Sequence, residues 1–375
     1  MLIQNARLFD GERLTDITAV RLRNGIVEAV DPALSPLPGE RVLDLAGDWL
    51  VPGFVDVHIH AFRGHDTMQG EEAVRQMSRD LRQLGVAAFC PTTMSASPEE
   101  THAALGGIQR VMEHPEPLGS RVIGAHMEAP FLQEKKAGAQ RCEFFRDPDW
   151  SLLLDWTDGH PECVRLITVA PERAGSEAFI RQAAAAGIHV SIGHTDADAA
   201  AAHRAADWGA DHVTHTFNAQ PPLHHRKPGT VGAALTDDRL WCEGIFDGIH
   251  LDWDIVRLLV RCKGAARAVA ITDAMEAAGM PDGLYHLGGQ EVRVQEGAAR
   301  LADGTLAGSV LTLGRALENL IHKAGIDPET ACALCTSTPA DSVGEPLLGR
   351  IKPGAPAVMT RWSPDWHLIE TVTDD

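Results

Sequence analysis

Residues 52–60 read PGFVDVHIH, and the pattern of the chain changes at this point. The first fifty residues before it resemble short β-strands, with Asn24-Gly25 as a hairpin turn. After it, short apolar strands alternate with helical stretches such as 71–85, 176–187 and 254–264. That alternation is typical of βα units and predicts a parallel sheet.

Eight strands can be counted in the part of the chain that follows residue 52. They are predicted at 54–60, 86–93, 121–129, 164–172, 189–195, 211–218, 241–250 and 267–274. Eight is the number that closes a TIM (β/α)8 barrel, so the predicted class is α/β. We expect the barrel to occupy residues 51–334, with a small β-domain formed by residues 1–50 plus 335–375.

Composition excludes several classes of partner. The chain has 375 residues, a hydrophobic fraction of 44% and a formal charge of −19. Such a charge repels nucleic acid and anionic membranes, although a local basic cluster could still bind a small phosphorylated substrate. We identify neither a signal peptide nor an apolar run of about 20 residues, and seven scattered cysteines fit the cytoplasm. Cys332 and Cys335 are interpreted as one helix turn and not as a zinc or redox site.

Polar side chains stand at the carboxyl ends of most predicted strands. They are His58, His60, Thr92, Thr93, Glu128, Glu172, His194, His215, Asp247, His250 and Asp273. A barrel gathers these ends on one face, where its active site lies. His58 and His60 alternate on one strand and so point to the same side, where two imidazoles can bind one divalent ion.

Glu128, His194 and His215 end three different strands. Two imidazoles and a carboxylate, with one open position for water, form the protein ligands of a catalytic zinc-type site. Asp273 ends the eighth strand, where a carboxylate can take a proton from the attacking water and pass it to the leaving amine. The alternatives are that the histidines are core residues and that Asp273 caps the next helix.

The loop HTFNAQPPLHHRKPG (215–229) carries a basic cluster in an acidic protein. Arg226 offers a bidentate fork for phosphate, although a solvated basic loop is the alternative. Asn218 and Ala219 offer backbone groups just past His215. Further on, DGIH (247–250) adds a second polar cluster, and the small residues of TLAGSVL (305–311) could lie close to a ligand.

The motifs PGFVDVHIH, GHDTM, HMEAPF, GHTDA, THTFNAQPPLHHRKPG, DGIH, TDAMEAAGMPDG and LAGS occur in the order found in N-acetylglucosamine-6-phosphate deacetylases of the amidohydrolase superfamily. The chain resembles that family from about residue 1 to residue 360. The resemblance implies a TIM barrel with a small β-sandwich built from both chain ends. It also implies that Glu128, His194 and His215 hold the metal and that Asp273 is the acid/base.

The same resemblance implies a set of substrate-binding residues. They are Asn218, Ala219, Arg226, His250 and the Leu306-Ala307-Gly308 backbone. In this family the Arg is lent to the neighbouring subunit, which implies a homodimer. Three positions depart from the family pattern: Ala129 replaces a Gly, Lys227 replaces an acidic residue, and Gln140 stands where the family has a His that polarises the amide carbonyl. Gln can still donate a hydrogen bond to that carbonyl but cannot be cationic.

These observations predict metal-dependent hydrolysis of the N-acetyl group of N-acetylglucosamine 6-phosphate. The expected cofactor is one or two divalent ions per subunit, Zn²⁺ first and Fe²⁺, Mn²⁺ or Co²⁺ as alternatives. The second ion would be held by His58 and His60, which some members of the family keep and others have lost. Alternative functions are deacetylation of another N-acyl amino sugar phosphate, such as the galactosamine epimer, hydrolysis of an N-acyl amino acid, or non-catalytic sensing of a sugar phosphate.

Overall fold

The computed structural model describes residues 1–374, and most of them form a closed parallel barrel. Its strands are β6 (Phe54–Ile59), β9 (Val86–Thr93), β11 (Ala125–Met127), β12 (Val164–Val169), β13 (His189–Ile192), β14 (His212–Val213), β15 (Trp241–Ile245) and β16 (Ala268–Ile271). The short β10 (Arg121–Val122) also pairs with β9. The first and last strands are joined just past their ends, because Asp273 N–H donates to the His58 carbonyl (2.8 Å) and His60 N–H to the Ala274 carbonyl (3.0 Å). The predicted TIM barrel is confirmed.

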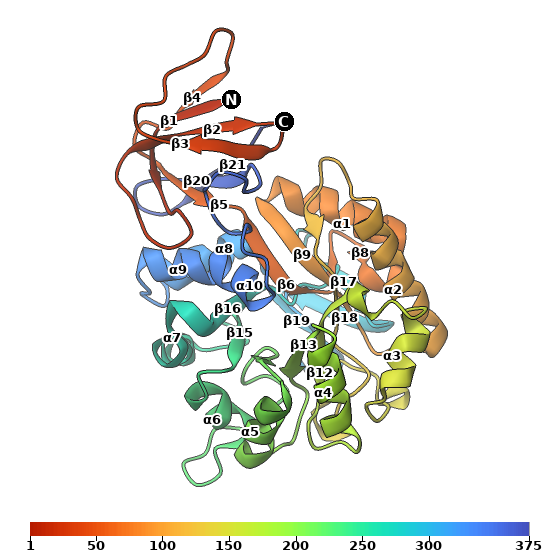
Figure 1. Cartoon of the computed structure of the whole chain (residues 1–375). Helices are drawn as coiled ribbons and strands as arrows, with labels where there is room; N and C mark the ends of the chain where they lie inside the picture. Colours follow the sequence, from red (N-terminus) through yellow and green to blue (C-terminus); the bar gives the residue numbers. More distant parts are fainter. Residues whose placement is uncertain (375) are drawn as a thin grey trace.

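The barrel strands are buried on both faces because helices cover them on the outside. Every residue of β6 and β9 is buried, as expected for a parallel sheet between two packed layers. The helices are α1 (Glu71–Gln83), α2 (Pro98–Glu113), α3 (Trp150–Trp156), α4 (Ser176–Ala185), α5 (Ala199–Trp208), α6 (Gly229–Thr236), α7 (Trp253–Arg267), α8 (Leu313–His322), α9 (Pro328–Cys335) and α10 (Ser337–Ser342), and Figure 1 shows them around the strands. The helices predicted at 71–85, 176–187 and 254–264 are α1, α4 and α7.

Both ends of the chain build a small domain beside the barrel (Figure 1). Its strands are β1 (Leu2–Leu8), β2 (Thr18–Arg23), β3 (Ile26–Val30), β4 (Val42–Asp44), β5 (Trp49–Pro52), β20 (Val358–Trp362) and β21 (Leu368–Thr373). Asn24 and Gly25 join β2 to β3 with positive φ (54° and 75°), as the predicted hairpin turn requires. The expected small sandwich domain is confirmed, whereas the boundary near residue 335 stays a prediction.

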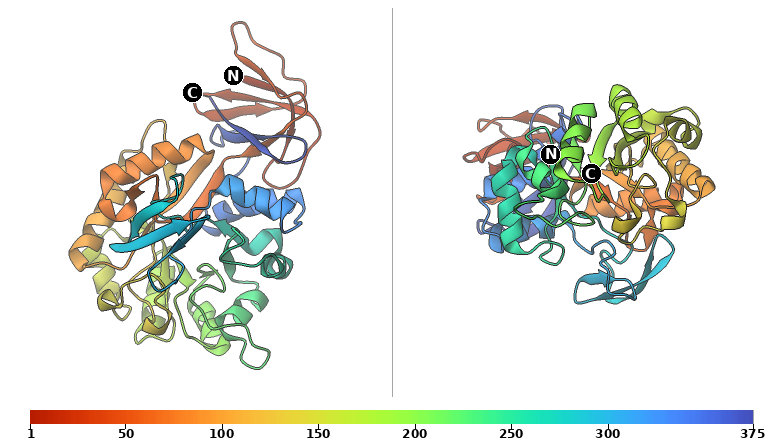
Figure 2. Two further views of the ribbon diagram at one scale, coloured as in Figure 1. Left: turned by 180° about the vertical axis from the view of Figure 1, so that it is seen from behind. Right: turned by 90° about the horizontal axis from the view of Figure 1, so that it is seen from below.

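A three-stranded sheet that the sequence analysis did not anticipate follows β16. It consists of β17 (Gly283–Leu287), β18 (Gln290–Gln295) and β19 (Ala298–Arg300), and the right view of Figure 2 shows it projecting from the barrel. Two further short strands, β7 (Ala61–Phe62) and β8 (His65–Asp66), form a separate pair after β6. Both additions follow the carboxyl end of a barrel strand, which is the face where the site residues gather.

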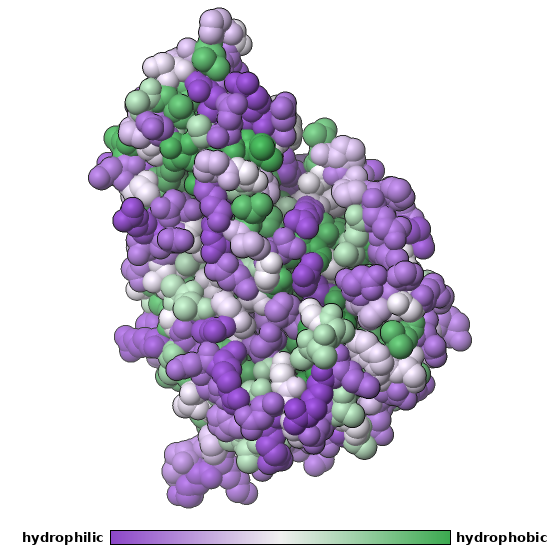
Figure 3. All heavy atoms as spheres, in the orientation of Figure 1, coloured by the Kyte–Doolittle hydropathy of each residue, from purple (hydrophilic) through white to green (hydrophobic). Residues whose placement is uncertain are grey.

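The surface is mostly hydrophilic on the face that Figure 3 draws, with hydrophobic side chains more frequent over the small domain. Exposed examples in that domain are Ile17, Ile26, Leu37, Val42, Leu368 and Ile369. In residues 1–374 the structure contains no helix with the length and apolarity that crossing a bilayer would take. All seven cysteines are free, and Cys332 and Cys335 are buried on α9, as their interpretation as one helix turn predicts.

Candidate active site

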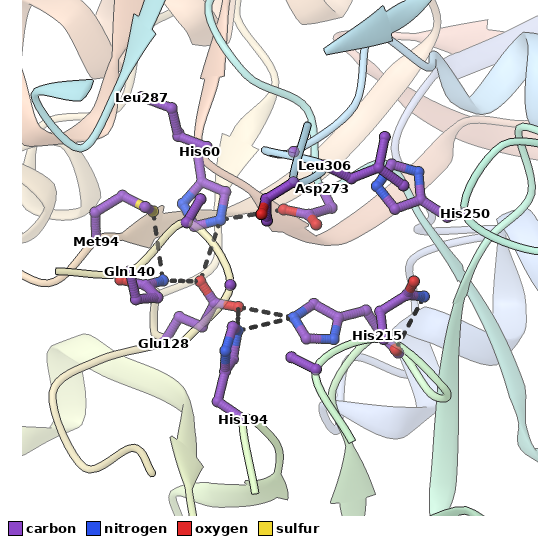
Figure 4. A pocket seen from close by; sticks show the side chains of 16 residues that line it. His60, Met94, Glu128, Gln140, His194, His215, His250, Asp273, Leu287 and Leu306 are labelled. Atoms are coloured by element: carbon purple, nitrogen blue, oxygen red, sulfur yellow. Dashed lines mark hydrogen bonds and ion pairs between the residues drawn. The ribbon is translucent and has the colours of Figure 1, made fainter. Parts of the chain in front are cut away.

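A pocket of about 220 Å³ opens at the carboxyl ends of the barrel strands (Figure 4). It is lined by His60, Met94, Glu128, Gly138, Ala139, Gln140, His194, His215, Asn218, Ala219, His250, Asp273, Leu287, Thr305, Leu306 and Gly308. Most residues singled out from the sequence are among them, although they come from segments far apart in the chain. The barrel therefore brings these candidate residues together around one cavity.

Glu128, His194 and His215 form the first cluster of potential metal ligands. Oε1 of Glu128 lies 3.0 Å from Nε2 of His194 and 3.0 Å from Nε2 of His215, and the two Nε2 atoms are 3.1 Å apart. All three side chains are buried. Such a set of two imidazoles and one carboxylate matches the ligands of a catalytic zinc-type site.

His58, His60 and Asp273 form a second cluster next to the first. Oδ1 of Asp273 lies 3.1 Å from Nε2 of His60 and 3.5 Å from Nε2 of His58. Glu128 contacts this cluster as well, because its Oε2 is 3.3 Å from His60 Nε2. Oε1 of Glu128, which contacts the first cluster, also lies 3.6 Å from His58 Nε2. One carboxylate therefore faces both clusters, an arrangement that can hold two cations side by side.

The hydrogen bonds behind the rings fix which ring nitrogen faces the site. His194 Nδ1 lies 2.8 Å from the Lys136 carbonyl, and His60 Nδ1 lies 3.2 Å from the Thr92 carbonyl. A carbonyl only accepts, so each Nδ1 carries the hydrogen and donates it. In the neutral rings the Nε2 lone pairs then point at each other or at carboxylates, which is unfavourable unless a cation lies between them. These rings are therefore oriented as metal ligands.

The electrostatics of the two clusters agree with that orientation. Burial disfavours the imidazolium of His60, but Asp273 and Glu128 raise its pKa to about 10. Burial opposes ionisation of Glu128, yet His194 and His58 hold the pKa of Glu128 well below its usual range. The pKa of Asp273 is likewise lowered, against burial, by His58 and His60. The site is thus built to keep both carboxylates ionised and to attract positive charge.

Three of these residues have unusual backbone conformations. His194, His215 and Asp273 adopt φ values of 44°, 26° and 48°, in the region that L-residues seldom occupy. Such conformations persist where surrounding structure imposes them, and they gather at functional sites. Each of these three residues lies where the chain leaves a barrel strand, and each side chain lines the pocket.

Gln140 lies in the pocket with its amide orientation fixed. Its Oε1 accepts a 2.7 Å hydrogen bond from the Ser95 backbone N–H, so its NH₂ group points the other way. That group donates to Oε2 of Glu128 and to the sulfur of Met94, 3.4 Å away. Because a thioether is a weak acceptor, one N–H of Gln140 remains available to a substrate oxygen.

The remaining predicted residues divide into two groups. Asn218, Ala219, His250, Leu306 and Gly308 line the pocket. Asp247 does not; it accepts a 2.7 Å hydrogen bond from Nδ1 of His250 and so orients that ring. Ala307 is buried in the hydrophobic cluster behind the pocket wall.

Arg226 lies on the exposed loop between β14 and α6, where its Nη1 contacts Nε2 of His225 at 2.7 Å. It does not line the pocket of its own subunit. Among the described residues that do line it, none is Lys or Arg.

Sequence analysis missed several residues of the site. Met94 directly follows the second strand, a position that could have identified it. Leu287 comes from the β17–β18 hairpin, whose Gly288-Gly289 turn between alternating strands was a signal not used. Glu243, beneath the pocket, accepts from His58 Nδ1 at 3.1 Å, and nothing in the sequence indicated that contact.

The fold and the site are those of a metal-dependent hydrolase, and the comparison with known families agrees. Residues 49–374 match the amidohydrolase family model, so the chain belongs to the amidohydrolase family. It is 36% identical, over 93% of its length and 87% of the relative's, to an N-acetylglucosamine-6-phosphate deacetylase of Vibrio furnissii. It is 33% identical, over 98% of its length and 96% of the relative's, to an N-acetylgalactosamine-6-phosphate deacetylase of Escherichia coli O157:H7.

Among solved structures, the chain is similar to a mutant N-acetyl-D-glucosamine-6-phosphate deacetylase from Mycobacterium smegmatis in complex with N-acetyl-D-glucosamine-6-phosphate. The TM-score is 0.90 at 31% identity, covering 98% of this chain and 96% of that one. The resemblance to the N-acetylglucosamine-6-phosphate deacetylase family is thereby confirmed.

Proposed function

We propose that this protein hydrolyses the N-acetyl group of N-acetylglucosamine 6-phosphate to glucosamine 6-phosphate and acetate. The observation that carries the proposal is the set of Glu128, His194 and His215, converging within 3.1 Å of one another beside Asp273. A divalent cation held by these three residues would supply the Lewis acidity that makes water nucleophilic near neutral pH. Zn²⁺ suits the donor set, and Fe²⁺, Mn²⁺ and Co²⁺ are the alternatives.

Asp273 and Gln140 would move the proton and stabilise the developing charge. Asp273 is ionised, so it can accept a proton from the attacking water and then deliver it to the amide nitrogen as the carbon–nitrogen bond breaks. Gln140 could turn the N–H that contacts the weakly accepting sulfur of Met94 toward the carbonyl oxygen, whose negative charge grows as water adds. His58 and His60 would hold a second cation. That cation could polarise the same carbonyl and so replace the family His, whose position Gln140 occupies here.

Among the described residues that line the pocket, no Lys or Arg is present to bind the phosphate. Arg226 is exposed on the loop that follows His215, a ligand candidate, and it forms no ion pair with a carboxylate in the described chain. This arrangement supports a homodimer in which Arg226 of one subunit reaches the phosphate in the pocket of the other. Seven free cysteines and the absence of a disulfide among them support a cytoplasmic location.

The galactosamine epimer is a second candidate substrate. It is favoured by the Escherichia coli relative, which is similar over 98% of this chain. The two sugars differ only in the configuration of one hydroxyl group, so both would present the same acetamide and the same phosphate to the residues described above.

The deciding experiment is acetate release by metal-loaded protein. N-acetylglucosamine 6-phosphate, its galactosamine epimer and unphosphorylated N-acetylglucosamine should be compared, with an N-acetyl amino acid as a fourth substrate. We expect the phosphorylated sugars to be hydrolysed and the unphosphorylated sugar not to be. The epimer with the higher kcat/KM identifies the preferred substrate. Asp273→Asn should lower kcat by about 10²- to 10⁴-fold while the cation of the Glu128–His194–His215 cluster, to which Asp273 does not belong, stays bound. Absence of turnover on all four substrates by metal-loaded protein would instead favour a sugar-phosphate sensor.

A further inference from the structure

A second cavity lies directly behind one wall of the catalytic pocket. It measures about 220 Å³, and its lining includes Asp66, Met68, Ser95, Arg141 and Gly288. Met94 is the residue that lines both cavities in the described chain. The two spaces are therefore separated by a partition to which Met94 contributes its side chain.

The Met94 side chain is held in the partition from two sides. On one side its Cε packs against the β17–β18 turn so closely that a Cβ added to Gly288 would lie only 3.0 Å from it. On the other side its sulfur accepts a hydrogen bond from Nε2 of Gln140 at 3.4 Å. Only 3% of Met94 is exposed, so it fills the gap between the hairpin turn and Gln140.

The position of Met94 relative to the proposed catalytic residues indicates which part of a substrate it would meet. Figure 4 shows Met94, Gln140 and Leu287 on one side of Glu128 and Asp273, and His250 and Leu306 on the other. His250 makes its side polar, which suits a sugar phosphate, whereas Met94 belongs to a hydrophobic cluster with Leu287. An amide bond cleaved between the two sides would direct its acyl group toward Met94.

We infer that Met94 closes an acyl subsite and limits the substrate to short N-acyl groups, with the second cavity as the space that longer chains would need. The inference rests on the proposed deacetylase function and adds to it the residue that selects the acyl group. The reaction stays the same: water adds to the acyl carbon, the carbon–nitrogen bond breaks, and a carboxylate and the amine are released. Only the length of the released carboxylate changes.

The test compares N-acetyl, N-propionyl and N-butyryl glucosamine 6-phosphate, with release of the common amine product as the readout. One methylene misfitted in a rigid apolar pocket typically costs about 10- to 200-fold in kcat/KM. The wild-type enzyme should therefore lose at least about 10-fold from acetyl to butyryl. Met94→Ala should open the partition and raise the butyryl-to-acetyl ratio of kcat/KM by about 10-fold or more.

Two variants serve as matched controls. Met280→Ala makes the same change at an exposed methionine that lines neither cavity, so the acyl ratio should stay at the wild-type value. Met94→Leu keeps the volume of the partition and should also leave the ratio unchanged. If Met94→Ala does not accumulate as folded protein, Met94→Val provides a smaller opening and should change the ratio in the same direction.

An unchanged ratio in folded Met94→Ala or Met94→Val, or equal rates on all three substrates in the wild type, would overturn the inference. Failure of the wild-type protein to hydrolyse any of the three would contradict the proposed function itself. The two failures are therefore distinguishable.

Discussion

Glu243 connects the two halves of the candidate metal site from below. It is fully buried, and its Oε2 accepts both from Nδ1 of His58 and from the backbone N–H of His215, each at 3.1 Å. A carboxylate behind a ligand imidazole fixes the ring and increases the basicity of the nitrogen that faces the metal. Glu243 should therefore affect metal binding without contacting the metal.

We expect Glu243→Gln to weaken the affinity of the His58–His60 half for its cation by about 10- to 100-fold, because the neutral amide supports the imidazole less well. The measurement is metal bound per subunit in metal-buffered solutions, which needs no turnover. Glu345→Gln, whose carboxylate pairs with Arg121 and Arg165, is the control and should bind metal like the wild type. Equal metal affinity in the two variants would refute a role for Glu243.

Among the individual site residues, the sequence predicted those that end barrel strands and few of the residues that reach the site from elsewhere. Glu128, His194 and Asp273 could be identified because topology alone brings the ends of parallel strands together. Gln140 was found only through the family resemblance, since it follows no strand and reaches the site through a loop. Glu243 is defined by packing in three dimensions, which a linear pattern of polar and apolar residues does not encode.

Among the elements, α6 depends on a buried lysine of its neighbour. Lys263 on α7 donates to the carbonyls of Ala234 and Asp237 at 3.0 and 2.8 Å, and so satisfies the carboxyl end of α6. The last carbonyls of a helix have no partners within it, and leaving them buried without one is costly.

Replacing Lys263 with Met keeps most of the side-chain volume but removes both donated hydrogen bonds. We expect Lys263→Met to lower the free energy of unfolding by about 1–3 kcal/mol, measured by denaturant titration. Lys323→Met changes an exposed lysine and should have little effect. Equal stability of the two variants would mean that water satisfies the carbonyls of α6.

The elements were predicted unevenly, for reasons that the structure makes plain. The strand expected at 86–93 is β9 with the same bounds, because its residues are buried throughout. The strand expected at 211–218 is only His212–Val213, because the chain turns sharply where His215 enters the pocket. The β17–β19 sheet was not predicted, although its Gly288-Gly289 turn lies between two strands of alternating residues.

For the whole molecule, the absence of Lys and Arg from the described pocket lining gives the proposed homodimer a direct test. Arg226→Ala and Asp273→Asn should each be nearly inactive alone. If Arg226 serves the partner's pocket, equal amounts co-refolded or co-expressed should regain about a quarter of wild-type activity, since half of the dimers are mixed and each has one complete site. If it serves its own pocket, no mixed dimer contains a complete site and activity stays at the level of the parents.

The overall architecture was the most predictable level, because eight strands and a change of pattern at residue 52 leave few alternatives to a barrel with a β-domain. The association of two chains could not be predicted from the sequence, because an exposed basic loop has the same sequence whether or not a second subunit covers it. The loop supports a homodimer only because the described residues that line the pocket include no Lys or Arg.

The single charge of Glu128 faces both halves of the site, and this has a thermodynamic consequence. A cation bound in the His194–His215 half draws on the negative charge that the His58–His60 half also needs, and it repels a second cation nearby. Linkage makes this penalty reciprocal, so occupancy of either half weakens the other equally. Metal titration should therefore proceed in two separate, anticooperative steps, and the protein would pass through a range of metal concentrations in which each subunit holds one ion.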